Sequence, residues 1–174
     1  MSATHSQDQF LSLLDEHRRI LFKIAGSYCR NPADREDLIQ EMVMQLWRSF
    51  SSYDPSRRFT TWMYRVALNV AISHWRSETR RVRDTVPIDG AILEIAAPPS
   101  GEAALEDDLR ELRLLLDQLD PLDRALMILY LDGNPHEAIA DVLGISPSNV
   151  GTRIGRIKQR LRRTFERANE GRKD

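Results

Sequence analysis

The stretch from residue 136 to residue 163, HEAIADVLGISPSNVGTRIGRIKQRLRR, has the pattern of two short helices joined by a tight turn. Gly144 can adopt the left-handed backbone conformation that ends the first helix, and Ser146 followed by Pro147 can begin the second. Steps of 4, 3 and 4 residues then separate the apolar residues of the second helix, which are Val150, Ile154, Ile157 and Leu161. The pattern predicts a helix-turn-helix over about Pro135 to Arg163.

The other face of this second helix carries basic and amide side chains that can reach phosphates and base edges in a DNA major groove. The candidates for DNA contact are Ser146, Asn149, Arg153, Arg156, Lys158 and Arg160. Gly151 and Gly155 interrupt this face, and each is expected to cost the helix about 1 kcal/mol relative to alanine. The alternative is a helical hairpin that only packs and leaves its arginines in solvent.

The remainder of the chain predicts an all-α protein of two small helical domains. Helix-favouring residues dominate, and strand-type alternation is hard to find. Residues 84–105 lack apolar periodicity and carry five helix-disfavouring residues, which are Pro87, Gly90, Pro98, Pro99 and Gly101. We therefore expect a domain at 1–83, a flexible acidic linker at 84–105 and a helix-turn-helix domain at 106–174.

Within the first domain the apolar pattern predicts three helices. Apolar residues recur at helical spacing from Gln9 to Ser27, and Asn31-Pro32 is expected to end the helix that they form. A second helix is expected over Pro32–Phe50. Thr60 or Thr61 can cap a third, which continues through Trp75 into the arginines that follow.

The charges are segregated along the chain although the net charge is only −1. Residues 57–83 hold seven basic and one acidic residue, a net of +6, and residues 146–174 hold nine and three, again +6. Between them, residues 84–145 hold three basic and 14 acidic residues, a net of −11. Basic clusters in structured segments are typical of phosphate-binding surfaces, so nucleic acid is the expected partner.

Several other kinds of site are not supported by the sequence. Cys29 is the only cysteine, and the four histidines are scattered, so no metal site or disulfide is expected. No phosphate-binding glycine loop or nucleophile motif is present, so neither a cofactor nor catalysis is expected. The chain lacks an apolar run of membrane-spanning length and an N-terminal signal pattern, and we expect a cytoplasmic protein without membrane insertion.

Two segments resemble a known family. DREDLIQEMVMQLWRSF (34–50) and RFTTWMYRVALNVAISHWRSETRR (58–81) resemble conserved region 2 of extracytoplasmic-function (ECF) sigma factors of the sigma-70 family. LDQLDPLDRALMILYLDG (116–133), together with the helix-turn-helix, resembles their region 4. The resemblance implies a non-enzymatic subunit that binds core RNA polymerase and directs it to promoter DNA. It also implies that an anti-sigma factor holds the chain inactive.

The resemblance also assigns roles to residues. The polymerase-binding residues would be Asp37, Leu38, Gln40, Glu41, Leu46 and Trp47. The residues that melt and capture the −10 element would be Phe59, Thr61, Trp62, Tyr64, Arg65 and Asn69, with Arg76, Arg80 and Arg81 on phosphates. The helix-turn-helix residues would read the −35 element. Trp62 and Trp75 are also expected to belong to the core, because large aromatic side chains with apolar neighbours usually do.

The length of the linker is compatible with this assignment. Two turns of B-DNA span about 70 Å, and the 22 residues of 84–105 can extend over about 73 Å. The alternative function is a stand-alone helix-turn-helix regulator that binds operator DNA without polymerase. In that protein the acidic helix and the aromatic segment would have no evident role.

Overall fold

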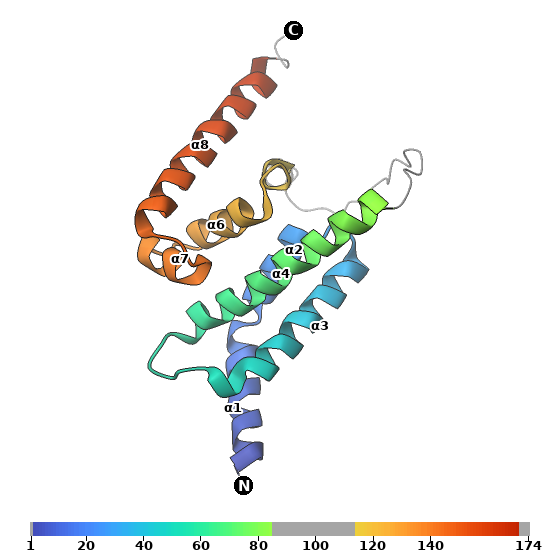
Figure 1. Cartoon of the computed structure of the whole chain (residues 1–174), viewed down its shortest axis with the longest axis vertical. Coiled ribbons are helices and arrows are strands. Elements are labelled where there is room, and N and C mark those ends of the chain that lie inside the picture. Colours follow the sequence, from blue (N-terminus) through green and yellow to red (C-terminus); the bar gives the residue numbers. More distant parts are fainter. Residues whose placement is uncertain (1, 85–113, 171–174) are drawn as a thin grey trace, which may run out of the picture.

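The computed structural model describes residues 2–84 and 114–170, and every regular element in these ranges is a helix (Figure 1). In chain order the elements are α1 (Ser2–His17), α2 (Arg19–Tyr28), α3 (Pro32–Ser49), the 3-10 helix η1 (Phe50–Ser52), α4 (Phe59–Asp84), α6 (Pro121–Leu131), α7 (His136–Leu143) and α8 (Pro147–Glu170). The prediction of an all-α protein with two helical units is confirmed. The predicted linker, apart from Asp84, lies outside the described residues.

The N-terminal unit is built on α2, α3 and α4, which pack against one another along their lengths. Their facing side chains are almost completely buried, among them Leu21, Ile24, Leu38, Met42, Leu46, Met63 and Leu68. The start of α3 follows from its sequence, since Pro32 occupies the first turn and the Asn31 side chain accepts a hydrogen bond from the Ala33 amide at 2.9 Å.

Two of the expected helix boundaries were wrong. The stripe from Gln9 to Ser27 is divided between α1 and α2 at Arg18, because Phe10 packs on aromatic rings at the end of α3 whereas the apolar face of α2 packs on α3 and α4. The third helix begins at Phe59 rather than after a threonine cap. The Trp62 amide already donates to the Arg58 carbonyl at 3.3 Å, so helical bonding starts before either threonine.

The C-terminal unit contains the predicted helix-turn-helix. Gly144 has φ +69° and ends α7, as expected for the left-handed position of the turn. The Ser146 hydroxyl accepts a hydrogen bond from the Asn149 amide at 3.1 Å, which caps α8. Val150, Ile154 and Ile157 are buried against α6 and α7, as their spacing predicted.

The two units are in contact through α4, against which α6 and α7 lie (Figure 1). In this view α6 and α7 lie between the start of α8 and the N-terminal helices. Among the helices of the described ranges, none combines the length and apolar character needed to cross a membrane.

Candidate nucleic-acid interface

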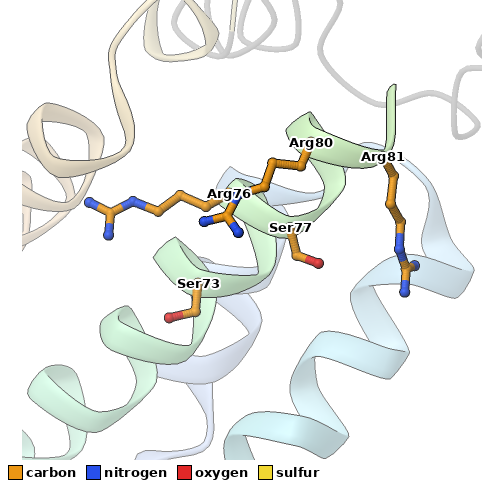
Figure 2. A pocket seen from close by; sticks show the side chains of 5 residues that line it. All are labelled: Ser73, Arg76, Ser77, Arg80 and Arg81. Carbon is orange, nitrogen blue, oxygen red and sulfur yellow. The ribbon is translucent and has the colours of Figure 1, made fainter. Parts of the chain in front are cut away.

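The second half of α4 carries a shallow basic groove lined by Ser73, Arg76, Ser77, Arg80 and Arg81 (Figure 2). All five side chains are exposed and come from consecutive turns of one helix. Arg81 also pairs with Glu78 at 3.1 Å. The structure thus brings the three predicted phosphate contacts together, and guanidinium and hydroxyl groups in this arrangement can donate hydrogen bonds to the oxygens of a nucleic-acid backbone.

The first turns of α4 and the loop before them form an aromatic cluster. Trp62 is half-buried, and its ring centroid lies 5.2 Å from that of Tyr53 and 5.4 Å from that of Phe59. Phe59 is 6% exposed and its ring contacts that of Tyr53 edge-on at 5.5 Å. Tyr53 was not among the candidates from the sequence, because it precedes the aromatic segment and lies in a polar loop. The partly exposed rings of Tyr53 and Trp62 can accept an unstacked base.

The predicted −10 residues in the first half of α4 differ in their exposure and in the partners that they already have. Asn69 is exposed and Thr61 is half-exposed. Tyr64 is only 5% exposed, and its hydroxyl donates to the Asp132 carboxylate. Burial and then this hydrogen bond raise the pKa of Tyr64, so the hydroxyl keeps its proton. Arg65 Nη2 donates to Asp141 Oδ1 at 2.8 Å.

The outward face of α8 holds the predicted −35 residues in three different situations. Asn149 and Arg156 are exposed and make no side-chain hydrogen bond or ion pair within the described part of the chain. Lys158 lies over the Tyr130 ring at 4.5 Å. Arg160 donates to the Gln118 carbonyl at 2.8 Å.

Arg153 is held by two carboxylates at the start of α6. Its Nε donates to Asp123 Oδ1 at 2.8 Å, and its Nη2 lies 2.7 Å from the same oxygen. Its Nη2 also lies 3.9 Å from Asp120 Oδ2. The Arg153 side chain is 27% exposed. This contact ties α8 to the start of α6.

Replacing Gly155 with alanine is expected to raise the free energy of unfolding by about 0.5 to 1 kcal/mol, because alanine favours the helix and a Cβ at this position meets nothing within 4 Å. Urea denaturation followed by circular dichroism measures the change. Gly144→Ala is the matched control and should lower the same quantity, since φ there is +69°. Equal effects of the two substitutions would contradict this account of α8.

The predicted polymerase-binding residues also divide by exposure. Asp37, Gln40, Glu41 and Trp47 are exposed on α3. Leu38 and Leu46 are fully buried, so they support α3 from inside the unit and do not face a partner in this structure. The burial of Leu38 and Leu46 agrees with their spacing of eight residues, which places them on one apolar face of α3.

An apolar groove beside Trp47 was missed from the sequence. It is lined by residues of α1 and α3, which are Gln7, Phe10, Leu11, Val43, Met44 and Trp47. Leu11, Met44 and Trp47 are 50%, 51% and 43% exposed. The available signal was Met44, an apolar residue three positions before Trp47 on an otherwise polar face.

Comparisons with known proteins agree with this arrangement. The family model "Sigma-70 region 2" matches residues 13–81, and "Sigma-70, region 4" matches residues 109–161. The chain is 30% identical over 158 residues to the RNA polymerase sigma factor CarQ of Myxococcus xanthus, covering 90% of this chain and 89% of that protein. It is also 30% identical over 153 residues to the ECF RNA polymerase sigma factor SigE of Mycolicibacterium smegmatis, covering 86% of this chain but only 59% of SigE.

A solved structure has the same fold. The sigma factor RpoE of Bartonella quintana, in complex with the anti-sigma factor NepR, superposes with a TM-score of 0.66 at 23% identity, covering 92% of this chain and 96% of RpoE. The two family matches occur in the same order as the two helical units, and they contain the basic groove and the helix-turn-helix respectively. The chain therefore belongs to the ECF sigma factors of the sigma-70 family.

Proposed function

We propose that this chain binds core RNA polymerase and directs it to promoters, with the N-terminal unit opening and capturing the −10 element and α8 reading the −35 element. The observation that supports the proposal is the presence of two surfaces with exposed basic side chains, on α4 and on α8, in one chain of this family. A stand-alone regulator would need only the second. The chemistry of transcription belongs to the polymerase, and the sigma subunit acts by binding.

The division of labour within the N-terminal unit follows from the exposed groups. Opening a duplex costs base stacking, and aromatic faces and arginines that bind the separated strand can offset that cost. The Trp62 cluster supplies the aromatic faces and Arg76, Arg80 and Arg81 supply the cationic track. On α3, the exposed carboxylates of Asp37 and Glu41 suit a basic partner surface, and Trp47 with its groove suits an apolar one.

Two further points rest on the family alone. RpoE of Bartonella quintana was solved with an anti-sigma factor, and we propose that this chain is also controlled by one. We also place its activity in the cytoplasm, where bacterial core polymerase works.

The proposal is tested by adding the purified chain to sigma-free core polymerase and a library of promoter DNA, and then sequencing the run-off transcripts. New start sites that share upstream elements are expected. Transcription indistinguishable from that of the core enzyme alone, together with operator binding by the isolated chain at physiological salt, would favour the stand-alone regulator instead.

On a promoter identified in this way, Arg76→Ala combined with Arg80→Ala should reduce run-off initiation at least tenfold and flatten the dependence of open-complex formation on salt, because two phosphate contacts are lost. Arg18→Ala combined with Arg19→Ala is the matched control, since both arginines are exposed at the junction of α1 and α2, away from the groove. An unchanged salt dependence in the double variant would remove these arginines from the DNA interface.

A further inference from the structure

Three of the basic side chains of α8 already have partners within the C-terminal unit. Arg153 pairs with Asp123 at 2.7 Å, and Lys158 lies over the Tyr130 ring at 4.5 Å. Arg160 donates to a backbone carbonyl of the segment before α6 at 2.8 Å. The side chains whose charge points most directly to DNA are therefore engaged on the side of α8 that faces α6, and base reading falls to other residues of the helix.

The helical period shows which residues lie on the opposite side. Val150, Ile154 and Ile157 are buried, and at 3.6 residues per turn Thr152 lies almost opposite their mean direction. Gln159 shares this side but lies about 10 Å further along the helix axis. The residues that contact base edges in a helix-turn-helix belong to the N-terminal part of its second helix. Thr152 is therefore the residue of this side that is placed to meet a base pair.

Thr152 stands between two exposed residues that can bind bases. Asn149 precedes it by three residues and Arg156 follows it by four, so the three side chains are neighbours on one helical face. Asparagine can bind adenine, and arginine can bind guanine, through paired hydrogen bonds in the major groove. A side chain between them is placed to face the intervening part of the element.

The hydroxyl of Thr152 already has a partner inside the helix. Its Oγ1 donates to the Ser148 carbonyl, four residues earlier, at 3.0 Å. This bond uses the single proton of the hydroxyl and favours one χ1 rotamer. In this state Thr152 has a methyl group in a fixed direction to offer to a base, and it has no proton to donate to a base or a phosphate.

The next turn of the same face carries no side chain. Gly155 follows Thr152 by three residues and is exposed, and a Cβ built at Gly155 would meet nothing within 4 Å. A longer residue would stand beside Thr152 and keep the helix farther from the base pairs, whereas glycine permits a close approach of the backbone. The cost of Gly155 to helix stability is then offset by the access that it gives to the Thr152 methyl group.

We propose that Thr152 determines base specificity in the −35 element, and that its methyl group selects a thymine by contact with the thymine C5-methyl. Thymine is the base that presents a methyl group in the major groove, and threonine methyl groups contact it there. This inference rests on the proposed function, because it assigns a base to the surface through which α8 reads the −35 element.

The first test needs no protein variant. The full chain is bound to core polymerase, and the probes are duplexes that carry the −35 element of a promoter found by run-off transcription. Each thymine is replaced in turn by deoxyuridine, which lacks only the methyl group, and affinity is measured by competition fluorescence anisotropy. One replacement should weaken binding about fourfold, the effect of losing one buried methyl group. If no replacement changes the affinity, or if the element contains no A·T pair, the inference is overturned.

The second test removes the methyl group from the protein. Thr152→Ser keeps the hydroxyl, and it should bind the thymine duplex about fourfold more weakly than wild type does. It should also no longer distinguish thymine from uracil at the sensitive position, because the two methyl groups act as a pair. Thr152→Val keeps a methyl group without the hydroxyl and should retain the discrimination. Discrimination that persists in Thr152→Ser, or disappears in Thr152→Val, would overturn the inference.

Thr164→Ser is the matched control for the loss of the methyl group. Thr164 Oγ1 donates to the Arg160 carbonyl at 3.1 Å, which is the same bond within the same helix. Thr164 lies twelve residues after Thr152, about 18 Å further along the axis. This variant should match wild type on every duplex. Loss of discrimination in Thr164→Ser as well would indicate a general effect on α8 and count against a contact made by Thr152.

The outcomes for this inference and for the proposed function are distinguishable. If the promoter library gives no new start sites, the same measurements use duplexes that the full chain selects from random DNA. Discrimination through Thr152 on those duplexes would support the inference while the proposed function fails. New start sites whose −35 duplexes show no thymine discrimination would overturn the inference and leave the proposed function standing.

Discussion

Replacing Arg124 with methionine should lower the free energy of unfolding by about 3 to 5 kcal/mol. This is the largest change in stability that we expect from any single substitution proposed for this chain. Arg124 is 4% exposed. Its guanidinium donates to the carbonyls of Leu116, Asp117, Leu119 and Ser27 at 2.9 to 3.5 Å. Methionine fills a similar volume but removes the donor that these four carbonyls share. Urea unfolding of the full chain measures the loss.

Two further variants separate the hydrogen bonds of Arg124 from its charge. Arg124→Lys keeps the charge, yet a single ammonium cannot donate in four directions, so we expect it to recover only part of the loss. Arg18→Met removes an arginine that is 66% exposed and should change stability by less than about 0.5 kcal/mol. Full stability of Arg124→Met would mean that the carbonyls find other partners and that Arg124 does not hold the segment before α6 in place.

The helix-turn-helix could be predicted from sequence because each of its parts depends on local chemistry. Gly144 permits the turn, Ser146 caps α8 through its own hydroxyl, and Val150 follows the helical period. The division of Gln9 to Ser27 into two helices was not predictable in this way. It depends on the packing of Phe10 against Trp47 and Phe50, which lie more than 30 residues away in the chain.

The candidate site was predictable only as a list of residues, since the sequence does not say which side chains already have partners. Arg76 and Arg153 look alike in the sequence, but Arg76 lines an exposed groove and Arg153 is paired with Asp123. Leu38 and Asp37 are neighbours in one motif, yet the first is fully buried and the second exposed. Tertiary contacts alone make the first distinction, whereas side-chain polarity and the helical period already account for the second.

The same distinction leads to different expected salt dependences for two arginines of α8. Arg156 is exposed on the outward face, so Arg156→Ala should weaken binding to the −35 duplex about tenfold or more and reduce the slope of log affinity against log salt by about one. Arg153→Ala should also weaken binding, but through the position of α8. Its salt slope should stay close to that of wild type, because the charge of Arg153 is already matched by Asp123. Titrations of one duplex at several salt concentrations provide both numbers.

Asp123→Asn decides between the two roles for Arg153. If Arg153 positions α8, neutralising Asp123 loosens the tie to α6, and both the free energy of unfolding and the affinity for −35 DNA should fall or stay unchanged. If Arg153 contacts DNA, removing the competing carboxylate frees a guanidinium, and both the affinity and the salt slope should rise. Glu137→Gln removes an equal charge from α7 and corrects for the general gain in attraction to DNA. A rise beyond that control would return Arg153 to the DNA-reading residues, and a fall would leave Asn149 and Arg156 as the exposed side chains that read the element.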